Sequence, residues 1–409
     1  MAMTAPLLLL WITVALVVQV AIGIVVVMRS RGATKAPIRS TRTSQAAWQG
    51  LRPFRIDART FEDPAHHQCS FRLVPVDGIA LPPFQPGQFL TVVIPTSSVA
   101  PAAGDMTVGA FTRCYSLSDV PRADWYQITV KRALAPQAQP EVPTGIVSTY
   151  FHDRLVVGSI VDARAPSGQF VLDPDASVPV VLIGGGIGVT PLLSMLRWIL
   201  AEQPQRHVTL FFGVRSGADH AFKAILQELA ASHPTFDLHV LYGTPEAGDI
   251  EGRDFTHRGV ISLSLLAPLL AAGRHHYYVC GPPAMMERIV PALAAAGVAA
   301  TDLHVEAFGP ASVQWGPRLP SAATSHFAVQ FRQSGRTVTW DGGEASLLDF
   351  AESNGITIEA GCRSGSCGTC ETRVADGNVT HPQQPSFTIT AGFCLPCVGV
   401  PQSALVLDA

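Results

Sequence analysis

The pattern of apolar and polar residues divides the chain into regions with different expected folds. Between residues 48 and 174, short apolar stretches are separated by prolines and glycines, and they include FRLVPV, FLTVVIP, YQITVKRA and GSIVDARA. Stretches of this length, bounded by turn residues, are typical of strands in an all-β barrel or sandwich. We therefore predict an antiparallel β-barrel over 48–174.

A second pattern covers residues 175–310. Near-continuous apolar runs occupy 178–184, 207–215, 236–243 and 275–281, and stretches with helical periodicity such as PLLSMLRWILAEQ separate them. Strands that helices cover on both faces are apolar throughout, whereas half-exposed strands alternate. The pattern predicts an α/β domain built on a parallel sheet.

The third region follows a Pro/Ala/Ser-rich linker at 311–325. Residues 326–409 open with the strand-like segments HFAVQF and RTVTW, and a short helical stretch, SLLDFAESNG, comes next. We predict a small α+β domain here.

The segment 6–28 contains no charged residue. As a helix it would be roughly 34 Å long, which is enough for a hydrocarbon core of about 30 Å. Basic residues are frequent in the linker that follows, at 29–47. By the positive-inside rule, we expect one transmembrane helix in the cell membrane and all later domains in the cytoplasm. A cleaved signal peptide is the alternative.

Composition narrows the range of functions. The chain has 409 residues, a formal net charge of −3 and eight cysteines. Its length allows several domains, each with its own core. The weak negative charge argues against nucleic acid as a partner, and the free thiols point to a reducing compartment. Cys69 and Cys114 are expected to be small, buried, apolar side chains.

One Gly/Ser-rich loop holds the main candidate for metal chemistry. Cys362, Cys367 and Cys370 have the spacing C-x4-C-x2-C, and Cys394 and Cys397 follow later. Three thiols at this spacing, with a distant fourth, are typical of a plant-type 2Fe–2S cluster. A zinc site usually has two complete C-x2-C pairs, and disulfides within so small a loop would be strained. Both stay as alternatives.

The fourth cluster ligand follows from a resemblance. The segment from Cys394 to Pro401 resembles the end of plant-type ferredoxins, in which the last ligand precedes a short apolar stretch and a proline. This implies Cys397 as the fourth ligand after Cys362, Cys367 and Cys370, with Cys394 as a buried bystander. It also implies that 326–409 is a ferredoxin-like β-grasp domain.

Two glycine-containing turns follow predicted parallel strands. GGGIGVTP at 184–191 leads from a strand into a helix, and CGPP at 280–283 ends another strand. Glycines admit a close approach of the backbone, and the free N–H groups of a helix start favour an anion such as a pyrophosphate. The first turn lacks the G-x-G-x-x-G spacing, so the common dinucleotide fingerprint is absent.

Five motifs, taken in order, resemble the ferredoxin–NADP⁺ reductase superfamily. They are Arg113-Cys-Tyr-Ser, Gly145-Ile-Val-Ser148, Pro166 to Phe170, GGGIGVTP and CGPP, and the resemblance spans about 48–310. Segments such as RCYSLSD and ITVKRA are similar to the reductase parts of flavohaemoglobins, which implies FAD. The phthalate-dioxygenase-reductase branch shares the C-terminal cluster domain and leaves FMN open.

The resemblance implies roles for individual residues. Arg113 corresponds to the cation at the flavin phosphate, Ser116 to the residue near flavin N5, and Phe308 to the ring that stacks on the flavin. The implied catalytic residues are Ser116, Tyr115, Cys280 and Glu306. The implied cofactor-binding residues are Arg113, Tyr115, Ser116, Lys131, Gly145, Val147, Ser148, Gly185, Gly186, Gly188, Thr190, Pro191, Arg215, Cys280, Gly281, Pro282 and Phe308.

The choice between NADH and NADPH stays open. In the family, discrimination lies after the second strand of the nucleotide domain, here Val214 to Gly217. No acidic residue occupies this turn to hold a ribose hydroxyl, and Arg215 could meet a 2′-phosphate.

Taken together, these features predict a membrane-anchored NAD(P)H-dependent flavin/iron–sulfur oxidoreductase. Electrons would pass from NAD(P)H through the flavin to the cluster, and then to a redox protein such as an oxygenase, desaturase or cytochrome near the membrane. The alternatives are the reductase component of an aromatic-ring oxygenase and a redox sensor. No residue identifies the acceptor.

Overall fold

The computed structural model describes residues 47–99, 110–135, 144–308, 326–382, 385 and 387–409. The transmembrane helix expected at 6–28, nearly all of the linker at 29–47 and the linker at 311–325 lie outside them. Within the described residues, no helix is long and apolar enough to cross a membrane. The longest of these helices has 14 residues, roughly 21 Å. This finding contradicts the predicted localisation as a single-pass protein of the cell membrane.

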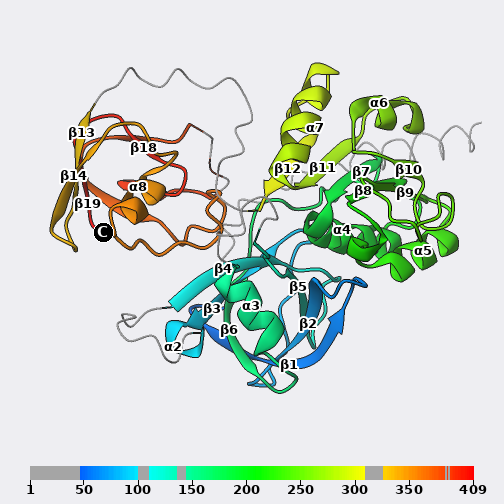
Figure 1. The fold of residues 1–409 in the computed structure, drawn as a ribbon, viewed down its shortest axis with the longest axis horizontal. Coiled ribbons are helices and arrows are strands. Elements are labelled where there is room, and N and C mark those ends of the chain that lie inside the picture. The colour runs from blue at the N-terminus through cyan, green and yellow to red at the C-terminus, as the bar shows by residue number, and fades with distance from the viewer. Residues whose placement is uncertain (1–46, 100–109, 136–143, 309–325, 383–384, 386) are drawn as a thin grey trace, which may run out of the picture. The chain divides into compact units, whose positions relative to one another are not determined.

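The first described region is a six-stranded antiparallel sheet in the order β4-β3-β6-β1-β2-β5 (Figure 1). Its strands are β1 Arg52–Phe61, β2 Gln68–Pro75, β3 Phe89–Pro95, β4 Ala110–Ser116, β5 Tyr126–Lys131 and β6 Ile160–Ser167, with the helices α2 Thr96–Val99 and α3 Ile146–Asp153. A bridge between Leu117 and Ile128 joins the two edges, so the sheet closes into the predicted barrel. Phe54 and Ile56 face its core and exposed Arg55 faces outward, as alternation along a strand requires.

The second region is a six-stranded parallel sheet in the order β10-β9-β8-β7-β11-β12. Its strands are β7 Val180–Gly185, β8 Val208–Val214, β9 Phe236–Tyr242, β10 His257–Arg258, β11 His276–Gly281 and β12 Leu303–Ala307. Its α-helices are α4 Val189–Glu202, α5 Lys223–Ser232, α6 Leu263–Leu266 and α7 Pro283–Ala295, and its 3-10 turns are η1 Gly186–Gly188, η2 Gly217–Asp219 and η3 Ala267–Leu269.

Two apolar cores cover the two faces of this parallel sheet. One contains the buried side chains of α4 and α5, and the other contains those of α6 and α7. The chain runs outward from β7 to β10 and then returns to β11 on the other side of β7. The strand order therefore reverses between β7 and β11, and ligands of open α/β sheets bind at the carboxyl edge of such a point.

The third region has a mixed sheet in the order β14-β13-β19-β15-β17, a separate β16-β18 pair, and one helix. Its elements are β13 Phe327–Phe331, β14 Arg336–Trp340, α8 Leu347–Ser353, β15 Thr372–Asp376, β16 Val379–Thr380, β17 Phe393–Cys394, β18 Val400–Pro401 and β19 Leu405–Leu407. Ser346 begins α8, because its Oγ accepts a hydrogen bond from Asp349 N at 3.1 Å. This α+β arrangement agrees with the prediction for the C-terminal part.

Candidate active site and metal centre

A cavity of about 300 Å³ brings together three segments that are far apart in the sequence. Strand β4 contributes Arg113 to Ser116, the end of β12 contributes Glu306 to Phe308, and the cysteine loop contributes Gly361 to Ser364. Most residues that the sequence singled out for catalysis therefore line one space. Cys280 is the exception, because it is fully buried and does not line the cavity.

Strand β4 presents alternating side chains to its two faces. Arg113 pairs with Val92 and Tyr115 with Leu90 across the β3–β4 ladder, so these two side chains share a face. Tyr115 packs edge-on against Phe151 at a centroid distance of 5.2 Å. Burial raises the pKa of Tyr115 above its usual value, so its hydroxyl stays protonated.

Ser116 carries a polar atom without a protein partner. The side chain is buried, and within the described residues its Oγ has no hydrogen-bond partner. Buried hydroxyls are normally paired, so an orphaned one at a cavity wall indicates a missing polar group of a ligand. This observation fits a flavin ring edge next to Ser116.

The turn before α3 is built around Gly145. A Cβ at this position would lie 2.7 Å from Ala133 Cβ and 2.8 Å from Ser148 Oγ, so the turn requires glycine. Ser148 Oγ donates to Gly145 O and accepts from Ala133 N, at 3.0 and 3.1 Å. The hydroxyl is thus used inside the turn, and what the turn offers an anion is the backbone N–H groups at the start of α3. Val147 is buried in the barrel core.

The glycine-rich loop after β7 is closely packed against the end of β11. A Cβ on Gly188 would lie 2.2 Å from Cys280 O, and one on Gly185 would lie 2.6 Å from Pro282 Cδ. Gly281 has the same limit, since its Cβ would lie 3.0 Å from Gly185 N. These three glycines therefore let the two turns meet at the carboxyl edge of the sheet.

The structure places three further predicted cofactor-binding residues in the glycine-rich loop and the first turn of α4. Gly186 adopts a φ of +50°, and Lys131 Nζ lies 3.8 Å from the position of a Cβ there, so a cation borders the loop. Thr190 Oγ1 donates to Ile187 O at 2.9 Å and is engaged within the turn. Pro191 is buried in the first turn of α4, where its missing N–H costs nothing.

Cys280 and Glu306 are opposite each other in the register of β11 and β12, and both are buried. Burial, with a smaller contribution from Cys362, raises the pKa of Glu306 to about 8. Burial and then Glu306 raise the pKa of the Cys280 thiol well above its usual value. Glu306 Oε2 has no partner within the described residues, so a protonated carboxyl faces the cavity at neutral pH. Phe308, at the cavity mouth, is 39 % exposed.

The turn that follows β8 is more acidic than its sequence indicated. Arg215 Nε donates to Asp219 Oδ2 at 2.9 Å, so the cation expected at a 2′-phosphate is paired with a carboxylate. Ser216 Oγ donates to Glu246 Oε1 at 2.8 Å, and Gly217 N donates to Asp249 Oδ2 at 3.1 Å. Three carboxylates surround the turn. Sequence reasoning missed them, because two come from the segment after β9.

The cysteine loop directs its backbone N–H groups at two sulfurs. Cys362 Sγ accepts from the N–H groups of Ser364, Ser366 and Cys367 at 3.2 to 3.4 Å. Cys367 Sγ accepts from Cys362 N at 3.3 Å. Backbone donors of this kind stabilise thiolates that bind metal.

The four predicted ligands form two pairs. Cys362 is hydrogen-bonded to Cys367, which raises the pKa of the Cys362 thiol, and Cys370 is hydrogen-bonded to Cys397, which lowers the pKa of Cys370. All eight cysteines are free, so the structure holds no disulfide of the alternative framework. Within the described residues, no three thiols have sulfurs all within 4.8 Å of one another. A single zinc ion would gather four sulfurs more tightly, at about 3.8 Å. Two thiol pairs instead fit two irons.

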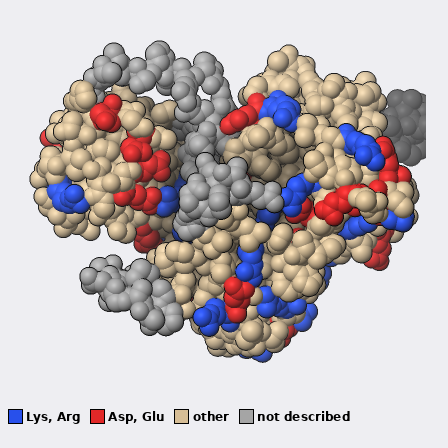
Figure 2. Space-filling model, in the orientation of Figure 1, with Lys and Arg blue, Asp and Glu red and all other residues tan. Residues whose placement is uncertain are grey.

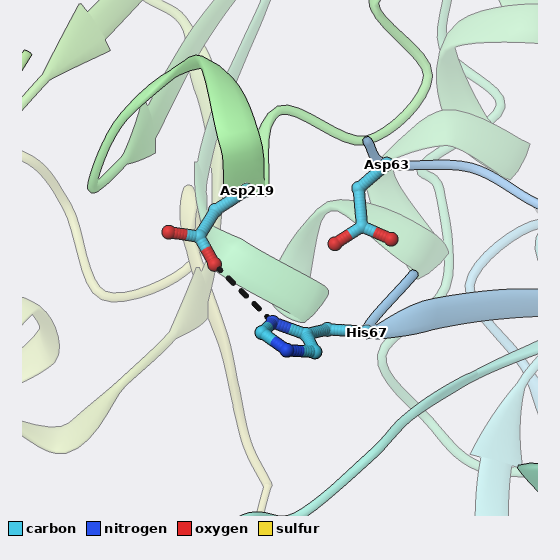
Figure 3. A group of neighbouring side chains, drawn as sticks. All are labelled: Asp63, His67 and Asp219. Carbon is cyan, nitrogen blue, oxygen red and sulfur yellow. Dashed lines mark ion pairs between the residues drawn. The ribbon is translucent and has the colours of Figure 1, made fainter. Parts of the chain in front are cut away.

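A separate group lies where the β1–β2 connection meets η2. Asp63, His67 and Asp219 point toward one another, with ligand-type atoms within 4.8 Å (Figure 3). Gln68 N donates to Asp63 Oδ1 at 2.8 Å, and Arg215 Nε donates to Asp219 Oδ2. Each carboxylate thus has a donor already, and we assign no metal to the group.

Comparison with known proteins agrees with these features. Residues 182–290 match the oxidoreductase NAD-binding domain family, and residues 329–402 match the 2Fe-2S iron-sulfur cluster binding domain family. The flavohemoprotein of Chromobacterium violaceum is 36 % identical over 267 residues, which are 65 % of this chain and 63 % of the relative. The chain thus spans less than two thirds of the length of that relative.

A solved structure decides the family. The flavohem-like FAD/NAD-binding domain of a nitric oxide dioxygenase from Vibrio cholerae is 32 % identical, with a TM-score of 0.53, and the match covers 63 % of this chain and 99 % of that domain. This chain belongs to the flavohaemoprotein-type FAD/NAD-binding oxidoreductases. Phthalate dioxygenase reductase is 25 % identical with a TM-score of 0.52, and the match covers 88 % of this oxidoreductase and 98 % of that protein. The oxidoreductase therefore combines FAD- and NAD-binding parts with a 2Fe–2S domain.

Proposed function

We propose that the chain takes electrons from a reduced nicotinamide coenzyme and delivers them singly, through its 2Fe–2S domain, to a separate redox protein. The observation that carries this proposal is the shared cavity, in which Tyr115, Glu306 and Cys362 line one space. When bound, FAD supplies hydride acceptance and the cluster supplies one-electron carriage. A reductase needs these two groups close together, and a cavity common to both binding regions supports this.

The flavin would be held from three directions. Arg113 and the backbone N–H groups at the start of α3 would bind its phosphates, and Tyr115 would pack against its ring. Ser116 Oγ, buried and without a partner, would donate to the ring edge. Phe308 would cover the ring until the nicotinamide enters, which its position at the cavity mouth supports.

The cluster would be bound by the two thiol pairs. Cys362 and Cys367 would hold one iron, and Cys370 and Cys397 the other. Cys394 lies in the short strand β17, paired with Thr372, and burial raises the pKa of its thiol to about 12. Cys397, in contrast, is paired with the loop cysteine Cys370. These facts favour Cys397 over Cys394.

The coenzyme would be NADH. A 2′-phosphate carries negative charge, and the turn after β8 is surrounded by Asp219, Glu246 and Asp249. Repulsion between these carboxylates and a 2′-phosphate disfavours NADPH. A carboxylate can instead accept a hydrogen bond from the 2′-hydroxyl of NADH. The variant Glu246→Ser should raise kcat/KM for NADPH relative to NADH. The exposed Glu202→Ser, in the same domain, should not.

The acceptor would be an oxygenase-type or cytochrome partner. Phthalate dioxygenase reductase, a modular structure for electron transfer from pyridine nucleotides to 2Fe-2S, matches 88 % of this chain. A cytochrome P450 reductase from Amycolatopsis is 26 % identical with a TM-score of 0.50. Residues 326–409 contain eight Asp and Glu against four Arg, and Figure 2 shows acidic side chains over this domain. A basic partner surface would suit it.

The order of electron transfer can be tested with Cys367→Ser. This variant should lose cytochrome c reduction while keeping NADH-dependent reduction of a dye that accepts electrons from flavin. Cys69→Ser, in the buried barrel core, is the matched control and should keep both activities. An equal loss of both activities in Cys367→Ser would contradict the proposed order.

A further inference from the structure

A buried aspartate of the barrel joins the strand at the shared cavity to the helix that follows the glycine-rich loop. Asp119 lies three positions after Ser116, the last residue of β4, and only 3 % of Asp119 is exposed. Its backbone carbonyl accepts a hydrogen bond from Ser194 Oγ at 2.7 Å, and its Oδ1 accepts one from Arg197 Nη1. Ser194 and Arg197 are three positions apart on α4, so both donors come from one face of that helix.

The barrel fixes Asp119 from its own side. Leu117 N donates to Gln88 O and Ser118 N donates to Gln127 O, both at 2.9 Å. The two residues that precede Asp119 are therefore bonded to other segments of the barrel, and Leu117 also forms the bridge that closes it. Asp119 is thus a fixed point of the barrel, and its hydrogen bonds to α4 would break if the helix moved away.

A packing contact beside Asp119 seats the same helix. Gly87 precedes Gln88, and a Cβ on Gly87 would lie 2.5 Å from Met195 Cε. Met195 follows Ser194 on α4 and is fully buried. The barrel backbone therefore lies directly against α4 next to the polar contact, and the glycine leaves room for the methionine side chain. Packing and hydrogen bonds fix the same part of the helix.

Helix α4 carries this constraint to the carboxyl edge of the parallel sheet. The helix begins at Val189, directly after Gly188 of the glycine-rich loop, and Ser194 lies about 8 Å from its start along the axis. The backbone hydrogen bonds of a helix keep its residues at a fixed spacing, so a shift at Ser194 displaces the loop as well. On the barrel side, at most about 11 Å of chain separates Asp119 from Ser116. The spacing between the loop and Ser116 is therefore set through Asp119.

We propose that Asp119 is a positioning residue for hydride transfer from NADH to the flavin, because it sets the distance between the glycine-rich loop and Ser116. The inference rests on the proposed function, since it takes NADH as the donor and the shared cavity as the flavin site. Asp119 does not line that cavity, so it acts through Ser194 and Arg197 and exchanges no proton. Misplacing reacting atoms by about 1 Å can slow a reaction about a hundredfold. The groups that bind the coenzyme move with the nucleotide domain, so its affinity should not change.

The test is stopped-flow reduction of the holoenzyme over a range of NADH concentrations, which separates the dissociation constant of NADH from the rate constant of flavin reduction. In Asp119→Ala we expect the rate constant to fall roughly tenfold and in Ser194→Ala roughly threefold, with the dissociation constant unchanged. The long-wavelength charge-transfer absorbance between nicotinamide and flavin should weaken in both variants. Asp77→Ala removes a carboxylate that is paired with Arg52 inside the barrel, and it should change none of these quantities. If Asp119→Ala does not fold, Ser194→Ala decides, because it removes only a hydroxyl.

Two results would overturn the inference. One is an unchanged rate constant and charge-transfer absorbance in a folded variant, even if its melting temperature is lower, which would indicate that Asp119 only stabilises the fold. The other is a weaker affinity for NADH with an unchanged rate constant, which would place the effect on binding. Failure of the proposed function gives a different result. In that case NADH does not bleach the flavin of the wild type itself.

Discussion

Glu306 on β12 faces Cys280 on the neighbouring parallel strand β11, and both side chains are buried at the carboxyl edge of the sheet. Because burial raises the pKa of Glu306 to about 8, its carboxyl is protonated at neutral pH and ionises as the pH rises past 8. The pair places a proton source, without a counter-charge, at the wall of the cavity.

Glu306→Gln should remove a pH dependence without disturbing the site. The amide mimics the protonated carboxyl, so the rate of flavin reduction by NADH at pH 7 should stay close to the wild-type rate. The wild-type rate should show an inflection near pH 8, and the variant should not. Stopped-flow flavin bleaching from pH 6 to 9.5 measures both. The exposed Glu287→Gln should keep the inflection, and its persistence in Glu306→Gln would rule out Glu306 as the titrating group.

Gly188→Ala should destabilise the nucleotide domain more than Gly248→Ala does. Its Cβ would lie 2.2 Å from Cys280 O, a backbone atom that cannot move without displacing β11. Overpacking of a well-packed site costs about 1–3 kcal/mol, and a clash with backbone lies toward the upper end. The expected result is a lower melting temperature and weaker NADH binding. Gly248→Ala has open space within 4 Å and is the control. Equal melting temperatures in the two variants would contradict the close packing.

The two cysteines near the C-terminus should behave differently. Cys397→Ser should lose the visible absorption of the cluster and most of its bound iron, because Cys397 supplies half of one thiol pair. Cys394→Ser should keep both. Iron per chain and the absorption spectrum after anaerobic reconstitution measure the difference. Loss of iron in Cys394→Ser, with retention in Cys397→Ser, would reverse the ligand assignment.

His220 should make the protein less stable in mild acid. Burial lowers the pKa of His220 to about 4, and its Nδ1 lies 2.8 Å from Tyr242 Oη. Between pH 6.5 and 4 the unfolded chain binds the proton and the folded chain does not, so stability falls as the pH falls through this window. The loss should reach about 2 kcal/mol by pH 5. Melting temperatures at pH 7 and pH 5 should diverge less in His220→Phe than in the wild type, and an equal divergence would show that His220 does not carry the effect.

Local sequence patterns predicted the fold well. The apolar stretch FLTVVIP predicted strand β3, and the continuous apolar run 178–184 predicted a strand buried on both faces. The spacing of Cys362, Cys367 and Cys370 needs only one loop, so it was readable from nine consecutive positions. In each case the physical cause, a period or a ligand spacing, lies within a few neighbouring residues.

Long-range contacts could not be predicted in this way. Glu246 lies thirty positions after Ser216, and nothing local indicates that its carboxylate accepts from that hydroxyl. Cys114 was expected to be a small, buried, apolar side chain, but the fold brings it to the cavity that the cysteine loop also lines. Thr190 and Ser148 were predicted to bind cofactor. In the structure both hydroxyls donate hydrogen bonds to carbonyl groups of their own turns. A residue's type indicates what it can bind, and tertiary packing decides which partner is near.

The central claim is that this chain moves electrons from NADH to its own 2Fe–2S cluster. The most direct measurement is anaerobic titration of the reconstituted protein with NADH, following flavin bleaching and the EPR spectrum together. The account predicts that the flavin bleaches and that a rhombic signal of a reduced cluster grows toward one spin per chain. Complete bleaching of the flavin with no cluster signal would contradict it.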